Sequence, residues 1–412
     1  MEGHVDGTAA SIVSGVTLRS ARELDVDELY PMRTVLTPLV SSDSETVSES
    51  GGEEFGPIPA VAKWAWGLRQ LSPAEGLLDR RVPASEPRVG DVVVVRVDRV
   101  GYHSTIVTRE NRKLRIYAGD LVAGVFGNRY ATDAYEAEVD GLDQLSLLTA
   151  GGMIGTIRSS HEEMTRATSV SFVGFAADVR GCRINLKEQL FHPSAADSAP
   201  ACPMVVVVGT GMNSGKTTVV SQILHGLSHR GVRVAAAKIT GSVSNRDVDE
   251  MRAADAVSVL DFSDYGFPST YLADPQELAL LWREIFMDSE SSRPDLLVVE
   301  IADGILERET ATILRDPSFL GRVSGLILSA ECSLSALAGV EELRTLGYPL
   351  LGVSGAFTSA PLYVREFQQR CDVPVLPSNK DGAELAAQVH DRLALHVTHG
   401  LTASERALRD RQ

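Results

Sequence analysis

The chain has 412 residues, 44% of them hydrophobic, and a formal net charge of −16. Its length allows two or three domains. The longest apolar runs are only as long as strands, and the N-terminus lacks the basic and apolar regions of a secretory signal, so we expect a cytoplasmic protein without a membrane partner. Because the acidic surface repels nucleic acid and no run of Lys or Arg is present, we expect no nucleic-acid partner.

One stretch of the N-terminal region is poor in apolar residues, whereas the residues before it, Ser20–Val40, could hold a short helix. Ser, Glu and Gly dominate the stretch Ser41–Pro57. Such a composition cannot bury enough apolar surface to offset the entropy lost on ordering. We therefore expect residues 1–57 to form a partly disordered segment.

The next region, residues 58–192, has the pattern of β-structure. Apolar or alternating runs such as Gly90–Val100 are separated by Gly, Asp and Asn, which predicts a β-rich domain in the form of a small barrel or a sandwich. Two corners, GNRYA (Gly127–Ala131) and GGMIGT (Gly151–Thr156), are either hairpin turns or the lining of a substrate pocket. Residues 193–203, rich in Pro, Ala and Ser, predict a linker.

Strand and helix patterns alternate over residues 204–412. This alternation predicts a doubly wound α/β domain with a parallel sheet, in which ligands bind at the carboxyl ends of the strands. The predicted strands are Met204–Val208, Val232–Lys238, Leu296–Glu300, Val323–Ser329, Leu350–Ser354 and Val373–Leu376. Predicted helices include Asp274–Met287, Ser335–Leu346 and Gly382–His396.

A phosphate-binding loop is predicted between the first of these strands and a helix over Lys216–Arg230. In the sequence MVVVVGTGMNSGKTT, four valines are followed by glycines that let backbone N–H groups approach an anion. Lys216 adds a positive charge, Thr217 offers a hydroxyl to Mg²⁺, and the helix N-terminus faces the same anion. A glycine turn that binds nothing is the alternative. The expected nucleotide-binding residues are Gly209, Thr210, Gly211, Met212, Asn213, Ser214, Gly215, Lys216, Thr217 and Thr218.

This loop departs from the P-loop pattern G-x-x-x-x-G-K-[ST], because Thr210 stands five positions before Gly215 and the glycine lies one position earlier, at Gly209. The form GTGMNSGKT resembles the loop of the dethiobiotin synthetase family and its relatives, the cobyrinic acid diamide synthases. The resemblance extends from Pro203 to the C-terminus and implies a P-loop NTPase domain that uses ATP and Mg²⁺. The whole arrangement also resembles two-domain bacterial proteins of unassigned activity, which implies an architecture but no reaction.

Acidic residues at two later strand ends are candidates for binding magnesium. In the sequence DLLVVEIADG, Glu300 stands at the carboxyl end of a predicted strand, where it would lie beside Thr217. Asp303 is a further acid just after this strand. In VLDFSDYG the candidates are Asp261 and Asp264, of which we favour Asp261. A solvated strand end or a turn cap is the alternative for each acid. The predicted metal ligands are Thr217, Asp261 and Glu300.

Lys238 ends the second predicted strand in AAAKITGS. It matches the lysine of the Lys-Pro stretch in the dethiobiotin synthetase family, whose ammonium group reaches between the phosphates and the reacting group, although Ile239 replaces the proline. A strand-end lysine that extends to solvent is an equal alternative. We expect Lys216, Lys238 and Glu300 to be the catalytic residues.

Together these residues favour an ATP- and Mg²⁺-dependent ligase. It would phosphorylate a carboxylate or carbamate of a small-molecule substrate, and an amine would attack the acyl phosphate. A nucleotide-dependent switch or assembly ATPase or GTPase, and a small-molecule kinase, remain open because they share the same residues. No Asn-Lys-x-Asp guanine motif is present, which favours ATP. The resemblance further implies a homodimer.

Overall fold

The computed structural model describes residues 55–71, 76–81, 86–194, 202–378 and 382–393. The predicted N-terminal segment up to residue 54, and residues 195–201 of the predicted linker, lie outside these ranges. The chain divides into two compact units, Met1–Ser50 and Gly51–Gln412, and every described residue belongs to the second.

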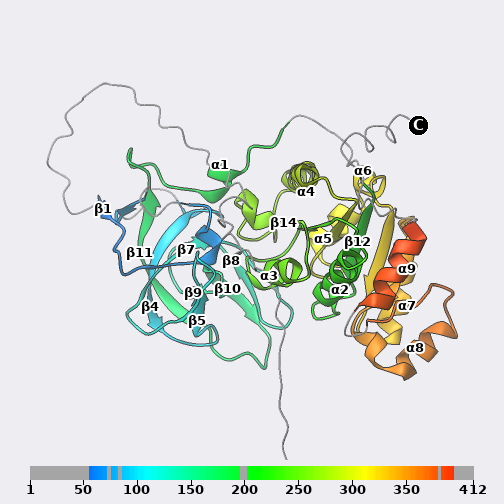
Figure 1. Cartoon of the computed structure of the whole chain (residues 1–412). Coiled ribbons are helices and arrows are strands. Elements are labelled where there is room, and N and C mark those ends of the chain that lie inside the picture. The colour runs from blue at the N-terminus through cyan, green and yellow to red at the C-terminus, as the bar shows by residue number, and fades with distance from the viewer. Residues whose placement is uncertain (1–54, 72–75, 82–85, 195–201, 379–381, 394–412) are drawn as a thin grey trace, which may run out of the picture. The chain divides into compact units, whose positions relative to one another are not determined.

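Strands dominate the described residues before α1 (Leu186–Leu190), as Figure 1 shows. Nine of them form one sheet: β1 (Phe55–Pro57), β2 (Lys63–Trp64), β3 (Leu77–Asp79), β4 (Val92–Arg99), β7 (Leu121–Phe126), β8 (Tyr135–Glu138), β9 (Leu145–Leu147), β10 (Met153–Ser160) and β11 (Thr168–Ala177). Two more, β5 (Thr105–Val107) and β6 (Lys113–Arg115), pair with each other.

The pairing in the nine-stranded sheet closes on itself. Strand β4 pairs with β7, β7 with β10, β10 with β9, β9 with β11, and β11 again with β4. This closed ring is the arrangement of a small barrel and not of a sandwich. The valine run of β4 is buried on both faces, because Val93 and Val95 pack in one apolar cluster and Val92 and Val94 in another.

A parallel sheet follows and confirms the predicted mixed α/β fold. Its strand order is β14-β13-β15-β12-β16-β17. The bounds are β12 (Met204–Gly209), β13 (Val234–Lys238), β14 (Ser258–Asp261), β15 (Leu296–Glu300), β16 (Gly325–Ser329) and β17 (Leu350–Ser354). The predicted strand over Val373–Leu376 is reduced to a single bridge between Val353 and Val375, since Pro374 has no N–H to donate to a ladder.

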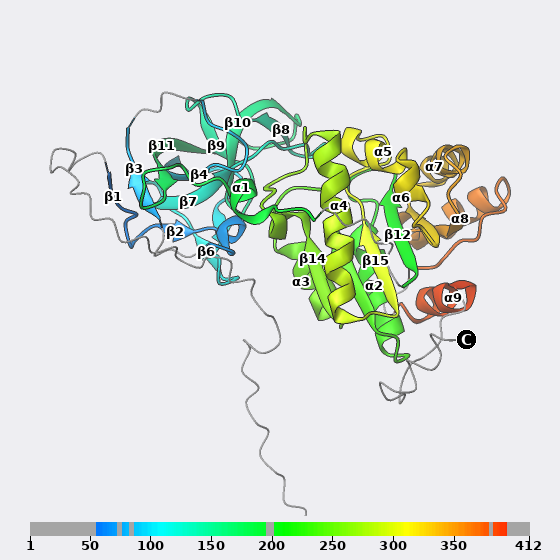
Figure 2. The same cartoon turned by 90° about the horizontal axis from the view of Figure 1, so that it is seen from above.

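Helices cover both faces of the parallel sheet (Figure 2). On β12, Val206 and Val208 share a cluster with α4, α5 and α7, while Val205 and Val207 pack with α2, α3 and α9. The bounds are α2 (Lys216–Ser228), α3 (Arg246–Ala253), α4 (Pro275–Ser289), α5 (Arg308–Leu314), α6 (Pro317–Leu320), α7 (Ser333–Thr345), α8 (Pro361–Gln368) and α9 (Ala383–Leu393). Short 3₁₀ turns are η2 (Trp66–Leu68), η4 (Phe262–Tyr265), η5 (Glu290–Ser292) and η6 (Ala356–Ser359). Within the described ranges, no helix combines the length and apolarity needed to cross a membrane.

Candidate functional site

The loop between β12 and α2 wraps tightly around the Lys216 side chain. A Cβ on Gly209 would crowd Ser214 Oγ and lie 2.9 Å from Lys216 Nζ, so any larger residue there would force these two side chains to shift. Gly215, at φ 99°, turns the chain into α2. Lys216 Nζ donates to the Gly211 carbonyl at 2.9 Å, inside the loop. The structure therefore has the curled backbone of a P-loop at the place that the sequence predicts.

Two hydroxyl groups of this loop have no hydrogen-bond partner within the described ranges, and its lysine is buried. Lys216 is 7% exposed, and burial lowers the pKa of its ammonium group although Glu300 and Asp303 attract it. The hydroxyls of Thr210 and Ser214 are buried without a hydrogen-bond partner among the described residues. Buried polar groups are nearly always hydrogen-bonded. An anionic ligand in the loop would supply the missing partners.

A buried charge cluster lies beside the start of α2. Thr217 Oγ1 lies 3.3 Å from Glu300 Oε1 and 3.4 Å from Asp247 Oδ1. Lys238 Nζ donates to Glu300 Oε1 at 3.1 Å and to Asp247 Oδ2. The structure thus places Glu300 beside Thr217, the neighbour that the sequence analysis expects, and brings Lys238 and Asp247 to the same cluster.

The charges in this cluster depend on one another. Burial alone would lower the pKa of Lys238, but Glu300 and Asp247 outweigh burial and raise it, so the lysine is charged. Burial likewise opposes the ionisation of Asp247, yet attraction to Lys238 lowers its pKa. For Glu300, burial prevails over Lys238 and raises the pKa. Lys238 therefore compensates the negative charge of Asp247 but only part of the charge of an ionised Glu300. A further cation beside Glu300 would favour its ionised form.

An unpartnered oxygen indicates where that cation would bind. Glu300 is 1% exposed, and its Oε2 is buried without a hydrogen-bond partner among the described residues. Carboxylate and hydroxyl oxygens are the ligands that Mg²⁺ prefers. Glu300, Asp247 and Thr217 therefore form a donor set that fits Mg²⁺.

Asp261, the other predicted metal ligand, lies in a different environment. It ends β14, caps η4 through Ser263 N at 2.8 Å, and pairs with Arg69 at 3.3 Å. Asp264 contacts the same arginine. The structure therefore places Asp261 in a buried ion-pair network, and its described contacts do not include Thr217.

A narrow recess, with a cavity volume of only about 10 Å³, lies at the carboxyl ends of β13 and β15. Asp303 lines it, and the next residue, Gly304, packs on the phosphate-binding loop, where a Cβ on Gly304 would lie 3.0 Å from Gly211 Cα. The recess is lined by Tyr130, Gly241, Ser242, Ser269, Thr270, Tyr271, Ala302, Asp303 and Glu307. Tyr130 comes from the GNRYA corner, whereas Gly151 of the GGMIGT corner packs against Val243.

The acids of the recess resist ionisation. Burial raises the pKa of Asp303 despite the nearby charges of Lys216 and Lys238. Burial and a hydrogen bond with Glu309 raise the pKa of Glu307 to about 8. A positively charged group entering the recess would favour the ionised form of both acids.

The pKa of Glu307 leads to a prediction on stability. Because the pKa is raised in the folded chain, the stabilisation by Glu307 is fully present below its ordinary value of 4.5 and is lost as the pH rises through about 8. Glu307→Gln keeps the oxygen that caps Thr310 N. We expect its melting temperature to match the wild type near pH 5 and to exceed it near pH 9. The exposed Glu162→Gln is the control. A difference between Glu307→Gln and wild type that is constant with pH would contradict this prediction.

Two residues of the loop also contact the β-rich region. Asn213 Nδ2 donates to Asp133 Oδ2 at 2.9 Å, and Thr132 N donates to Met212 Sδ at 3.2 Å. Thr218 is exposed at the start of α2. The phosphate-binding loop thus lies next to three features of the structure, which are the charge cluster, the recess and the strands before α1.

No protein-family model matches the chain, and no curated protein matches it. Similar solved structures include the signal recognition particle receptor FtsY from Elizabethkingia anophelis in complex with GDP, at 16% identity over 49% of this chain and 68% of that chain, with a TM-score of 0.32. A DUF1611 family protein from Anabaena variabilis is 16% identical over 50% of this chain and 63% of that chain, with a TM-score of 0.32. Cobyrinic acid a,c-diamide synthase from Mycobacterium smegmatis, with bound ATP analog and magnesium, is 16% identical over 49% of this chain and 98% of that chain, with a TM-score of 0.31. At TM-scores of 0.31–0.32 these likenesses are weak, and the parallel sheet and the loop of the chain itself define its fold.

Proposed function

We propose that the chain is an ATP- and Mg²⁺-dependent enzyme that activates a carboxylate or carbamate by phosphoryl transfer. The observation that carries this proposal is the buried cluster of Thr217, Glu300, Asp247 and Lys238 beside a loop curled around Lys216. The resemblance of the loop to the dethiobiotin synthetase family supports the same reaction. We assign the phosphates to the loop amides and Lys216, and Mg²⁺ to Thr217, Glu300 and Asp247.

The assignment of Asp247, in place of Asp261, leads to a matched pair of variants. Asp247→Asn removes a charge that lies 3.4 Å from the Thr217 hydroxyl, so we expect turnover to fall by about tenfold or more and the Mg²⁺ requirement to rise. Asp261→Asn weakens the pairing with Arg69, so we expect a loss of about 1–3 kcal/mol in stability with turnover retained. Turnover as a function of Mg²⁺ concentration, together with thermal melts, checks both. The reverse pattern would assign the metal to Asp261.

Lys238 connects the charge cluster to the recess. A Cβ on Gly241, which lines the recess, would lie 3.2 Å from Lys238 Cε. We place the acceptor beside this narrow recess, with Lys238 next to the phosphoryl group that moves. The ammonium group then neutralises negative charge on the phosphoryl group during transfer, and Mg²⁺ neutralises charge on the phosphates.

The proposed reaction has two steps. A carboxylate oxygen of the acceptor bonds to the γ-phosphorus, and the bond from that phosphorus to ADP breaks. An amine then attacks the carbonyl carbon, and phosphate leaves with the former carboxylate oxygen. The two acids of the recess, Asp303 and Glu307, suit a substrate that also carries an amino group.

The path of oxygen tests this chemistry. Acceptors with ¹⁸O-labelled carboxylates, and ¹⁸O-bicarbonate with a panel of diamines, are incubated with ATP and Mg²⁺, with a parallel arm in H₂¹⁸O. We expect label from the carboxylate or bicarbonate in the released phosphate. A stable phosphorylated product would indicate a kinase. Label only from water would contradict the ligase reaction.

A nucleotide-dependent switch is the second candidate. The contacts of Asn213 with Asp133 and of Met212 with Thr132 favour it, because they join the loop directly to the strand region. In a switch, these contacts would differ between nucleotide states and alter binding of a protein partner. Phosphate labelled only from water is the result that this candidate predicts.

A further inference from the structure

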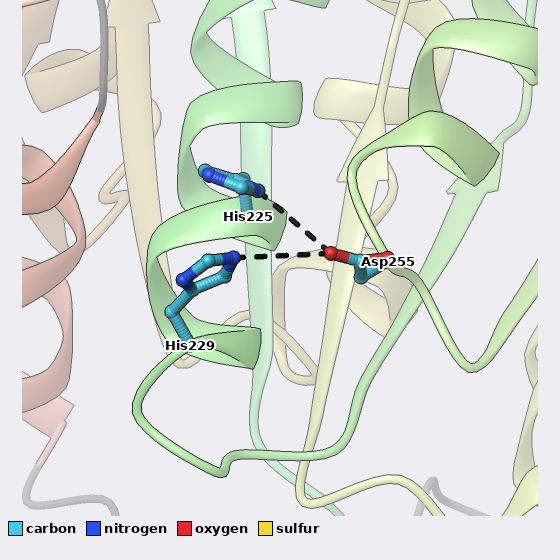
Figure 3. Close-up of side chains that lie close together, drawn as sticks. All are labelled: His225, His229 and Asp255. Carbon is cyan, nitrogen blue, oxygen red and sulfur yellow. Dashed lines mark ion pairs between the residues drawn. The ribbon is translucent and has the colours of Figure 1, made fainter. Parts of the chain in front are cut away.

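Two histidines and an aspartate lie close together near the C-terminal end of α2, away from the phosphate-binding loop. His225 and His229 are one turn apart on the same helix face, with ring centroids 4.1 Å apart, and Asp255 follows α3 (Figure 3). One carboxylate oxygen, Asp255 Oδ2, lies 3.8 Å from His225 Nδ1 and 4.0 Å from His229 Nε2. The potential ligand atoms all lie within 4.8 Å of one another.

These separations suit an ion between the three groups better than direct hydrogen bonds. Hydrogen bonds between nitrogen and oxygen require about 2.7–3.2 Å. A zinc ion with ligands at about 2.0–2.2 Å holds neighbouring ligand atoms roughly 3.3 Å apart. The side chains of His225, His229 and Asp255 are 44%, 64% and 63% exposed, so rotations of these side chains can close the remaining gap of roughly 0.5–1.5 Å.

The local field also favours a cation. The cluster lies at the C-terminal ends of α2 and α3, where the last backbone carbonyls carry partial negative charge. Among the described residues, the ion-pair partners of the Asp255 carboxylate are these two imidazoles alone. Within the described part of the chain, this carboxylate forms no ion pair with a lysine or arginine.

We propose that His225, His229 and Asp255 form a Zn²⁺ site. Two imidazole nitrogens and one carboxylate oxygen are a donor set that suits Zn²⁺, whereas Mg²⁺ and Ca²⁺ take oxygen ligands. The exposed side of the cluster leaves room for water as a fourth ligand. This site is independent of the proposed reaction.

The ion would link two helices that both begin at the candidate nucleotide site. Helix α2 begins at Lys216, and α3 carries Asp247 in its first turn. The two histidines lie at the opposite end of α2, and Asp255 follows the opposite end of α3. Zinc at this position therefore fixes the distance between the ends of the two helices and stabilises the folded chain by mass action.

Zinc titration of the full chain tests the site. After treatment with a chelator, wild type, His229→Ala and Asp255→Asn compete for Zn²⁺ with a chromophoric chelator, and melting temperatures are measured with and without Zn²⁺. His390→Ala is the matched control, because this histidine on α9 pairs only with its neighbour Asp391 among the described residues. We expect one Zn²⁺ per wild-type chain, undisplaced by excess Mg²⁺, and a raised melting temperature.

Affinity should fall by at least about tenfold in His229→Ala and Asp255→Asn and stay unchanged in His390→Ala. Melts without Zn²⁺ establish that each variant is folded. The proposal is overturned if His229→Ala and Asp255→Asn bind Zn²⁺ as wild type does, or if wild type binds none at micromolar concentrations.

Discussion

Lys216→Ala is expected to lower nucleotide turnover by at least about a hundredfold while the chain keeps its melting temperature. The Lys216 ammonium group contacts the Gly211 carbonyl inside the loop, and among the described residues it forms no ion pair with a carboxylate. Burial lowers its pKa, which means that the charge is costly to hold without a ligand. Its removal therefore affects bound phosphate far more than the folded state.

Phosphate release at saturating nucleotide and thermal melts are measured together for this variant. Lys113→Ala removes an exposed lysine of β6 and serves as the control. If Lys216→Ala turned over nucleotide as fast as the wild type, this result would contradict the assignment of the loop as the phosphate site. Lost turnover together with a collapsed melting temperature would mean that the lysine supports the fold instead.

Glu300→Gln is expected to lower turnover by about a hundredfold or more and to raise the Mg²⁺ concentration that half-maximal activity requires. Glutamine keeps the shape of the side chain, but its amide lacks the negative charge that binds the metal. Lys238 keeps its contact with Asp247, so the buried ammonium group retains one partner. Nucleotide binding without Mg²⁺ should change little.

The control for this variant is Glu284→Gln, because Glu284 is also buried, at 6% exposed, but accepts a hydrogen bond from Ser194 N and contacts neither Thr217 nor Lys238 in the described structure. Turnover should survive in Glu284→Gln. Equal losses in the two variants would indicate a general effect of removing a buried acid. An unchanged Mg²⁺ requirement in Glu300→Gln would contradict the metal assignment.

The loop and most of the parallel strands could be predicted because their signals are local. Four consecutive valines followed by glycines and Lys216 specify strand, turn and helix within about 20 residues, and the strands that end at Glu300 and Ser354 match their predicted bounds.

The place of Asp247 in the site could not be predicted, because the helix that carries it, α3, has a weak apolar pattern. Only Val248 and Met251 of its eight residues are buried, and most of the others are charged. The acidic residues in its first turn, Asp247 and Asp249, are the signal that favours a helix start there.

The environment of Asp261 depends on a contact that no local pattern encodes. Its partner Arg69 lies 192 residues earlier in the chain. The recess has the same property, because Tyr130 and Asp303 meet there from distant parts of the sequence. The spacing and periodicity of residues along the sequence do not predict which distant side chains tertiary packing brings into contact.

Calorimetric titration of the full chain with ATP, with and without Mg²⁺, tests the central claim most directly. The account predicts one nucleotide per chain, tighter binding with Mg²⁺, and loss of that Mg²⁺ effect in Glu300→Gln. Absence of ATP binding, or binding that Mg²⁺ leaves unchanged in the wild-type chain, would contradict it.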